Sequence, residues 1–445
     1  MYPVLSGKYT LLKQYGSSVI YPLVVDDEAI LASNEYRYEK INQTACEILE
    51  LCNGANNVEN IAHILSNRYN ENYDKALNLV SAFIEESIKK NFVLANDKCE
   101  EVPINVTGNY DTIFPFNIQF EVTKACPLKC AHCFNNSGEV RNKELNTEEI
   151  RLVMDKLKDM GVKKVMLTGG EVTTRRDFIK IVEMATERFL GISIATNGYF
   201  IDEKIAKELS RFKNRMVVQV SIDGAEKNHN KIRGVKDSFQ RAVAAIKSMA
   251  DNGIPVIVAT TFNELNFEDM EYITKLSKEI GAKQITYAMT CDIGRAKENS
   301  NIIGTIDPRK ILEKGAEMHE KYSDNTFWVK NDEVDDNIRT NKLKSCGRGC
   351  SQICVRENGD VSPCIQFNLS YGNLKNQDIN EIFDYRRIAP IVNFKEPDKS
   401  TCQDCAEARN CGGCVAIAWD IPESVCKWKR ENPDVVAAFN KLKEY

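Results

Sequence analysis

The chain has 445 residues, 43% of them hydrophobic and 28% charged, with a formal net charge of −5 at pH 7. This composition is ordinary for a globular protein of two to four domains, and the net charge argues against a nucleic-acid binder held by a broad basic face. No run reaches the ~18 apolar residues of a membrane span, and the N-terminus lacks a signal-peptide pattern. We therefore expect a cytoplasmic protein that binds neither nucleic acid nor membrane. Sixteen cysteines are the anomaly, because dense cysteines in such a protein more often bind metal than form disulfides.

The first hundred residues read as a small mixed domain. Residues 17–43 alternate in short apolar segments, as strands and hairpins do. Apolar residues then recur at helical intervals in three stretches, 43–52, 57–69 and 73–95. The pattern predicts an α+β domain over residues 1–100. Residues 101–115, polar and containing Pro103 and Gly108, are predicted to be a linker.

From residue 116 the pattern becomes strand, loop and helix, repeated. The expected strands lie within 116–123, 163–171, 191–198, 215–224, 254–263 and 282–289. Six βα units predict an α/β fold, a partial (β/α)6 barrel over residues 116–305, with function at the C-terminal ends of the strands. That geometry would bring Cys126, Gly169, Asn197 and Asp223 to one rim.

The last third of the chain looks different. Residues 306–345 are charged and helical, and we treat them as a bridging region. Residues 346–445 form the last predicted domain, with nine cysteines between Cys346 and Trp428 and little periodic pattern. Because such a segment cannot build a large apolar core, we expect metal centres to hold it together.

The loop "CPLKCAHCF" supplies three thiolates, from Cys126, Cys130 and Cys133. Cysteine is the usual ligand of a [4Fe–4S] cluster, and three cysteines leave one of its four irons open. The alternative is zinc with a distant fourth cysteine or with His132 as ligand. The tight spacing is expected to leave His132 pointing away from the metal.

This loop resembles that of radical S-adenosylmethionine (radical SAM) enzymes, in which CxxxCxxC is commonly followed by an aromatic residue. The resemblance continues through "TGGE" (168–171), "TNG" (196–198), "SIDG" (221–224) and the arginine of "KIRG". It implies these cofactor-binding residues: Phe134, Gly169, Gly170, Glu171, Thr196, Asn197, Ser221, Asp223 and Arg233.

The chemistry that this resemblance implies is specific. The amino and carboxylate groups of S-adenosylmethionine would occupy the open iron, with the backbone at Gly169 and Gly170, together with Glu171, orienting the amino group. Reductive cleavage of the sulfonium would give a 5′-deoxyadenosyl radical that takes hydrogen from unactivated carbon. The cofactor would perform the radical chemistry, and the protein would orient the reactants and exclude water from them.

The C-terminal cysteines resemble the SPASM extension of that family. They follow the order Cys346-x12-Gly359-x4-Cys364, then Cys402-x2-Cys405-x5-Cys411-x2-Cys414, then Cys426. The resemblance implies two auxiliary [4Fe–4S] clusters, three in all. Cys346, Cys364 and Cys414 would hold the first auxiliary cluster, and Cys402, Cys405, Cys411 and Cys426 the second. A zinc-ribbon interpretation of the paired CxxC motifs is the alternative, but it leaves Cys346 and Cys364 without a purpose.

Two departures from the SPASM pattern matter. The last tight gap, "CGGC", has two residues where the family usually has three, and residues 335–345 lack the cysteine that often completes the first auxiliary cluster. Either that iron is open, or Cys350 or Cys354 closes it. An open iron could bind a substrate thiolate and lower its pKa.

Four cysteines stay outside these motifs. Cys46 and Cys52 are predicted to be small core residues of an N-terminal helix. Cys99 lies in the polar segment without a partner. Cys291 follows the last barrel strand and could face the cavity, although a structural role is the simpler interpretation.

The N-terminal domain is similar to winged-helix-like peptide-recognition domains related to the pyrroloquinoline quinone chaperone. Such domains bind a leader peptide as an added strand at the edge of their sheet, beside the last helix. The alternative is a nucleic-acid module of similar pattern, but the stretch 58–69 carries no basic recognition face.

Over nearly its whole length the chain resembles sactisynthases of the subtilosin-maturase type. This implies a radical SAM maturase that forms thioether crosslinks from cysteine sulfur to Cα within a ribosomally made precursor. Its partners would be a cysteine-containing precursor peptide with a leader and an electron donor such as flavodoxin or ferredoxin. The alternatives are links to Cβ or Cγ, carbon–carbon or carbon–oxygen crosslinks, formylglycine formation and a zinc-stapled peptide-binding scaffold. Ile365, where formylglycine-forming relatives place an aspartate base, argues against the formylglycine alternative.

Overall fold

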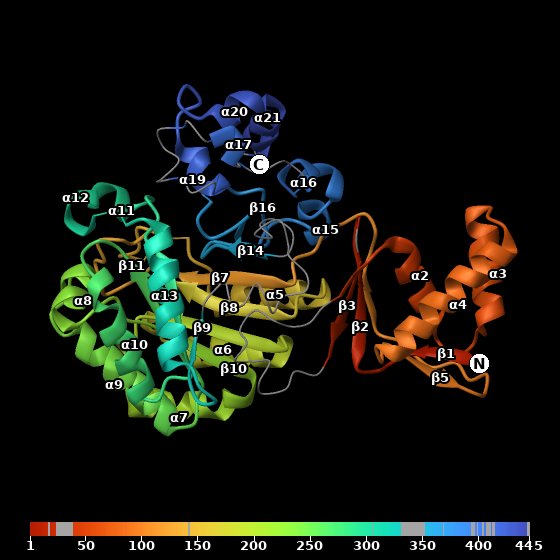
Figure 1. Cartoon of the computed structure of the whole chain (residues 1–445), viewed down its shortest axis with the longest axis horizontal. Helices are drawn as coiled ribbons and strands as arrows, with labels where there is room; N and C mark the ends of the chain where they lie inside the picture. Colours follow the sequence, from red (N-terminus) through yellow and green to blue (C-terminus); the bar gives the residue numbers. More distant parts are fainter. Residues whose placement is uncertain are drawn as a thin grey trace. The chain divides into compact units, whose positions relative to one another are not determined.

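The computed structural model describes residues 1–16, 18–23, 39–140, 143–304, 306–330, 352–367, 369–392, 397, 399–402, 405, 411 and 414–442. The chain divides into two compact units (Figure 1). The first comprises Met1–Phe114, Asp159–Gly161 and Phe383–Arg386, and the second Pro115–Lys158, Val162–Ile382 and Arg387–Tyr445. The first unit therefore runs through the segment predicted to be a linker.

Among its described residues, the first unit contains two small sheets and three helices. β1 (Tyr2–Leu5) pairs antiparallel with β5 (Val93–Asn96). The second sheet has the order β4-β3-β2-β6. Its strands are β2 (Tyr9–Lys13), β3 (Ser18–Pro22), β4 (Glu39–Ile41) and β6 (Val106–Gly108). The helices are α2 (Gln43–Leu51), α3 (Val58–Tyr69) and α4 (Tyr73–Lys89).

Each of these three helices begins at an asparagine. The side chains of Asn42, Asn57 and Asn72 accept a hydrogen bond from the backbone N–H three residues later, which is the preferred N-cap arrangement. The helices pack on a core that includes Cys46 and Cys52, both fully buried. The prediction that these two cysteines are core residues is confirmed.

Two sequence predictions for this unit need correction. The helix expected over 73–95 ends at Lys89, because Asn91 takes a left-handed conformation (φ 59°) and the chain then turns into β5. The predicted linker also contributes structure, since β6 pairs parallel with β2, with Val106 opposite Leu11. Backbone pairing, which composition does not report, ties this polar segment to the domain.

The second unit is built on one ten-stranded sheet (Figure 1), with the order β13-β12-β11-β10-β9-β8-β7-β14-β15-β16. The six predicted barrel strands occur as parallel neighbours in chain order. They are β7 (Asn117–Thr123), β8 (Lys164–Gly169), β9 (Gly191–Thr196), β10 (Met216–Ser221), β11 (Val256–Phe262) and β12 (Gln284–Met289). The partial barrel is therefore confirmed.

Helices follow the barrel strands as the pattern predicts. They are α5 (Thr147–Asp159), α6 (Phe178–Arg188), α7 (Glu203–Leu209), α8 (Glu226–Arg233), α9 (Ser238–Asp251) and α10 (Met270–Glu279), with short 3₁₀ turns η1 (Val172–Thr174), η2 (Ser210–Arg215) and η3 (Phe267–Asp269). Asn146 caps α5 by accepting from the N–H of Glu149, whose carboxylate accepts the N–H of Asn146 in return. This reciprocal pair of hydrogen bonds is a capping box. Within the described residues, no helix is long and apolar enough to span a bilayer.

The sheet extends beyond the barrel on both sides. β13 (Trp328–Val329) adds parallel to β12, after α11 (Arg295–Glu298), α12 (Ser300–Ile303) and α13 (Pro308–Tyr322). On the other side, β14 (Gln352–Val355) lies parallel to β7 and continues antiparallel into β15 (Asp360–Ser362) and β16 (Gly372–Asn373). Strands β14, β15 and β16 of the cysteine-rich region are therefore part of the barrel's own sheet.

The cysteine-rich region also has an apolar core, which the sequence interpretation missed. Its helices are α15 (Ile379–Ile382), α16 (Tyr385–Val392), α17 (Lys399–Cys402), α19 (Val415–Asp420), α20 (Lys427–Glu431) and α21 (Pro433–Leu442). Phe367 stacks on Phe439 with ring centroids 5.3 Å apart, and Trp419 lies 5.1 Å from Phe439. Trp428 is buried as well. These aromatic residues are scattered in sequence, so no periodic pattern reveals them.

Candidate functional site

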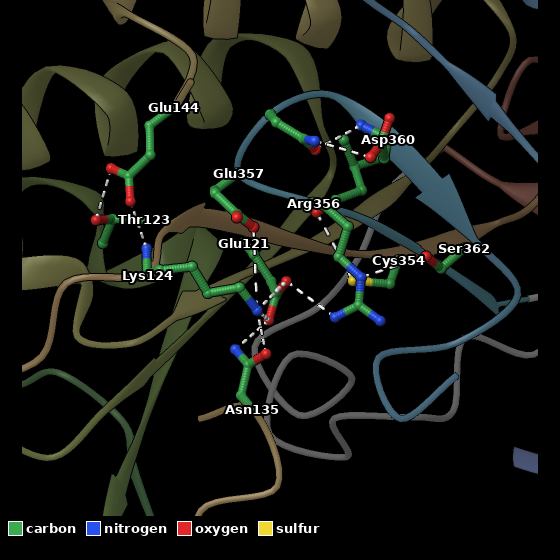
Figure 2. Close-up of polar contacts among 12 residues, drawn as sticks. Glu121, Thr123, Lys124, Asn135, Glu144, Cys354, Arg356, Glu357, Asp360 and Ser362 are labelled. Atoms are coloured by element: carbon green, nitrogen blue, oxygen red, sulfur yellow. Dashed lines mark hydrogen bonds and ion pairs between the residues drawn. The ribbon is translucent and has the colours of Figure 1, made fainter. Parts of the chain in front are cut away.

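The loop that carries the first three cysteines leaves the C-terminal end of β7. Its first residues are fixed by Glu144, whose carboxylate accepts from the Thr123 hydroxyl (2.9 Å) and from the Lys124 N–H (2.8 Å) (Figure 2). Backbone hydrogen bonds close the loop on itself, from the Cys126 N–H to the Gly138 carbonyl (2.7 Å) and from the Gly138 N–H to the Lys124 carbonyl (2.9 Å).

A second set of contacts holds the loop from the far side of the barrel. The Arg295 guanidinium donates to the carbonyls of Cys130 (2.9 Å) and Ser137 (2.7 Å), and its backbone N–H donates to the carbonyl of Cys133 (3.0 Å). Arg295 was not among the residues predicted from the sequence. The signal in the sequence was the glycine directly before it. The structure requires glycine at position 294, because φ is 61° and a Cβ there would lie 2.5 Å from the Phe134 carbonyl oxygen.

The "GGE" turn packs directly against the start of the cysteine loop. The Gly170 N–H donates to the Thr123 carbonyl and the Glu171 N–H to the Ala125 carbonyl, both at 2.7 Å. An ammonium group needs acceptors, so the carbonyl oxygens of this turn, rather than these two N–H groups, are the groups suited to orient an amino group.

The fully buried carboxylate of Glu171 joins two strand ends. It accepts hydrogen bonds from the Thr196 hydroxyl (2.6 Å), the Asn197 N–H (2.7 Å) and both the N–H and the hydroxyl of Thr173. Three of these donors share one oxygen of the carboxylate and the Asn197 N–H meets the other, so most of its roughly four acceptor positions are taken. Glu171 therefore positions Thr196 and Asn197, and its predicted role towards the cofactor stays a prediction.

The close fit of this turn gives a testable prediction. In Gly170→Ala the new Cβ would lie 2.2 Å from the Ala125 carbonyl oxygen, so the turn must move. We expect S-adenosylmethionine to bind at least ~10-fold more weakly, a change of ~1.4 kcal/mol, as measured by equilibrium binding to the anaerobically reconstituted protein. Gly138→Ala, in the adjacent cysteine loop, is the matched control, because a Cβ there meets nothing within 4 Å. Equal affinity of the two variants would contradict the prediction.

A buried ion cluster lies beside the loop, around Asp223. This carboxylate is fully buried and pairs with Arg233 (2.5 Å) and with His132 (3.0 Å), while its other oxygen accepts the Thr261 N–H (2.9 Å). The ring of His132 reaches Asp223 across the rim, a contact that was not predicted from the sequence, and its expected orientation away from the metal stays a prediction. The Nδ1 atom of His229 accepts the Asp223 N–H at 3.0 Å.

The charges of this cluster follow from burial and pairing. Burial alone would raise the pKa of Asp223, but the positive charge of Arg233, with a smaller contribution from His132, holds that pKa well below its usual range. Burial and the charge of Arg233 lower the pKa of His229 to about 3. The His229 ring is therefore neutral, as its acceptor role requires.

Two of the three loop thiols have a nitrogen donor at hydrogen-bond distance. The Asn197 side-chain amide lies 3.8 Å from the Cys126 sulfur, and an Arg233 nitrogen lies 3.7 Å from the Cys130 sulfur. Burial raises the pKa of Cys126 to about 12 and also raises that of Cys130, which Arg233 opposes. Such donors to sulfur are what tune a thiolate-bound cluster. Three thiols on one loop with outer hydrogen-bond donors fit the predicted cluster.

The structure thus brings the predicted rim together. Cys126 contacts Asn197, and Cys130 contacts Arg233, which pairs with Asp223. Ser221 ends β10 on the same rim, and Phe134 follows Cys133, both half-buried. No described contact assigns either of these two a role, so their cofactor contacts stay predictions.

The second predicted auxiliary set surrounds one pocket. Cys402, Cys405, Cys411 and Cys426 all line it, and Ile421 and Trp428 form apolar walls. No three described His, Cys, Asp or Glu side chains converge tightly enough to share one metal ion, whereas a cubane cluster takes each thiolate on a different iron. The zinc-ribbon alternative would use Cys414 as the fourth ligand, but it is Cys426 that lines this pocket.

The first auxiliary set is described only in part, because Cys346 and Cys350 lie outside the described residues. Cys364 and Cys414 are half-buried. Cys354 is fully buried within β14, and burial raises its pKa. Cys291 does face this region, since its sulfur lies 3.2 Å from the side-chain nitrogen of Gln366 and its pKa, raised mainly by burial, is also raised by Cys414.

Comparison with protein-family models decides the class. The Radical SAM superfamily model matches residues 120–276, the range that contains the cysteine loop and the contacts around Asp223. The chain is a radical SAM enzyme. The model for coenzyme PQQ synthesis protein D (PqqD) matches residues 28–93 of this radical SAM enzyme, and that for the SPASM iron–sulfur cluster-binding domain matches residues 346–406. The family thus implies S-adenosylmethionine, a radical SAM [4Fe–4S] cluster and auxiliary clusters, and the zinc-stapled scaffold is set aside.

Curated relatives match much of the length of the radical SAM enzyme. It is 25% identical to the antilisterial bacteriocin subtilosin biosynthesis protein AlbA of Bacillus subtilis, over 89% of this chain and 90% of AlbA. It is 29% identical to the sporulation killing factor maturation protein SkfB of the same organism, over 65% and 70%. Among solved structures, Streptococcus suis SuiB bound to S-adenosylmethionine shares the fold (TM-score 0.65, 17% identity, 95% of this chain and 99% of SuiB).

Proposed function

We propose that this enzyme joins a cysteine sulfur to the Cα of another residue within a ribosomally made precursor peptide. The observation that carries the proposal is the match to AlbA, a subtilosin biosynthesis protein, across the PqqD, radical SAM and SPASM regions together. SkfB, a maturation protein for a killing factor, supports the same class of substrate. Ile365 in place of an aspartate base argues against formylglycine formation.

The first unit supplies a docking edge for the leader of that peptide. Strand β6 covers the free edge of β2, so β4 ends the described sheet on the other side. Lys90, at the end of α4, pairs with Glu39 of β4 at 2.7 Å, which sets this edge beside the last helix. A leader added as a strand along β4 would gain backbone hydrogen bonds, and neighbouring side chains would give specificity.

The proposed reaction balances as an oxidation of the peptide. When bound, S-adenosylmethionine and its reduced cluster supply a 5′-deoxyadenosyl radical that removes hydrogen from Cα. Bond formation between the resulting Cα radical and the thiolate would complete the link, so that overall Cα loses one hydrogen atom, the thiol loses one proton and one electron is released. The auxiliary clusters are the proposed acceptor, and a flavodoxin or ferredoxin is the proposed reductant. The chain's own contribution is to hold the loop, the rim and the peptide in place.

The test uses a candidate precursor, a cysteine-containing peptide to be sought among short reading frames beside the gene, incubated anaerobically with enzyme, S-adenosylmethionine and reductant. We expect the peptide to lose two hydrogens for each link, and deuterium placed at Cα of the acceptor residue to appear in 5′-deoxyadenosine. A cysteine-to-serine peptide and a peptide without its leader serve as controls and should not react. A product of unchanged mass would refute the proposal, and so would loss of deuterium from Cβ or Cγ instead of Cα.

A further inference from the structure

A buried group of charges lies where the barrel strand β7 meets β14 (Figure 2). At its centre is Glu121, whose side chain is fully buried. Its carboxylate contacts Lys124, Asn135 and Arg356, which come from three different segments of the chain. None of these four residues was singled out from the sequence, and neither the thiolates nor the rim contacts described above use them.

One side of this group holds the cysteine loop at both of its ends. Lys124 lies two residues before Cys126, and Asn135 lies two residues after Cys133. The Lys124 ammonium pairs with Glu121 at 3.2 Å and also contacts the Asn135 side chain, which in turn donates to Glu121. A single carboxylate therefore connects the entry and the exit of the loop.

The other side holds the segment around Cys364. Arg356 pairs with Glu121 at 3.0 Å, and its guanidinium also donates to the carbonyls of Phe367 (3.0 Å) and Cys364 (3.4 Å) and to the Ser362 hydroxyl (3.2 Å). The planar five-donor fork of arginine suits this many fixed acceptors, and a lysine could not replace it. The predicted auxiliary ligand Cys364 is thus connected to Glu121 through one side chain.

The group is electrically balanced. Glu357 lies 4.0 Å from Lys124, so two carboxylates face two cations, and the most exposed of the four side chains, Arg356, is only 15% exposed. Buried ion pairs are weak contributors to stability, because desolvation opposes their attraction. Their hydrogen bonds are directional, however, and form in one geometry only. This group is therefore better suited to fixing the positions of the segments that it joins than to stabilising the fold.

We propose that Glu121 and Arg356 are positioning residues that hold the radical SAM cysteine loop and the Cys364 segment at one fixed separation. The inference concerns the distance between two predicted cluster sites and does not depend on which bond the enzyme forms in its peptide. The two residues act through the backbone that carries the ligands, and neither is a ligand.

The test compares Glu121→Gln with the double variant Glu121→Gln/Arg356→Gln in anaerobically reconstituted enzyme. The single variant leaves a net positive charge buried, whereas the double variant leaves only the balanced Lys124–Glu357 pair. We therefore expect a lower unfolding temperature for the single variant and recovery in the double. In both variants we expect a broader distribution of spin–spin coupling between the radical SAM cluster and the neighbouring auxiliary cluster. We also expect ~10-fold faster amide exchange over residues 361–367, a change that falls within the coupling energies measured between contacting residues.

The matched control is Glu183→Gln, which removes an exposed ion pair with Arg211 from the same unit and should leave the unfolding temperature, the spin–spin coupling and the amide exchange unchanged. If the double variant shows the same spin–spin coupling and the same amide exchange as the wild-type enzyme, the proposal is overturned. The group would then contribute to stability alone. These readouts need no peptide, so an absence of crosslinked product from the wild-type enzyme would refute the proposed function without touching this inference.

Discussion

Replacement of Cys130 by alanine is expected to abolish cleavage of S-adenosylmethionine in a chain that still folds. Cys130 is 7% exposed, and its sulfur lies 3.7 Å from Arg233. With this thiolate gone, the loop offers only two ligands, too few to retain a cubane whose fourth iron must stay open for the cofactor. The loss should be ~4 irons per chain, measured by iron analysis together with 5′-deoxyadenosine formation.

The control is Cys99→Ala, because Cys99 is exposed and belongs to none of the predicted ligand sets. It should keep full iron content and full activity. The pocket of Cys402, Cys405, Cys411 and Cys426 should keep its own cluster in Cys130→Ala, so the visible absorbance should fall and not vanish. Full iron content with undiminished cofactor cleavage in Cys130→Ala would remove the basis of the proposed site.

Asp223→Asn is expected to destabilise the fold by ~3 kcal/mol, the lower end of what breaking a buried ion pair costs. The neutral amide leaves the buried guanidinium of Arg233 without its counter-charge. It also replaces the carboxylate that His132 contacts. Arg233 also reaches Cys130, so the iron-loaded variant should show an altered spectrum of the radical SAM cluster. Denaturant unfolding of the anaerobic protein measures the first effect, and low-temperature EPR the second.

The matched control is Asp237→Asn, which removes the exposed ion pair with Arg241 and should leave the unfolding midpoint unchanged.

The pH dependence of the stability that Asp223 contributes has a definite sign. Because the folded pKa of Asp223 lies below its unfolded value of 3.8, its contribution to stability is present above that pH and is lost as the pH falls below it. The Asp223→Asn variant lacks this acid-dependent part. Equal acid sensitivity of this variant and the wild-type protein would contradict our assignment of charge.

The residues that the sequence could reveal are those whose neighbours lie close in the chain or at one predictable edge. Cys126, Cys130 and Cys133 share a loop, and the parallel strands of a barrel all end at the same rim. Asn197 and Asp223 could therefore be placed beside that loop before any coordinates were known. Glu171 was recognised as part of a turn, but its four internal hydrogen bonds depend on the packing of β8 against β9 and on the η1 turn.

Other contacts had no such signal. The ion pair between Glu121 and Arg356 joins residues 235 positions apart, and it exists because β14 lies in register beside β7. The strand β14 is too short for its pattern to be read, and its neighbours up to residue 351 are rich in cysteine and charge. The contact of His132 with Asp223 lacked a signal for the same reason, since Asp223 follows a distant strand.

The position of β14 has a consequence for how the chain is made. β7 leaves the ribosome more than 200 residues before the strand that completes its outer side, so during synthesis one row of its backbone N–H and C=O groups stays unpaired. Such an edge readily pairs with another chain, and long-range parallel pairing is slow to form. A protein truncated before residue 352 would keep all three cysteines of the radical SAM loop but would expose the edge of β7. It should therefore aggregate rather than accumulate as a smaller active enzyme.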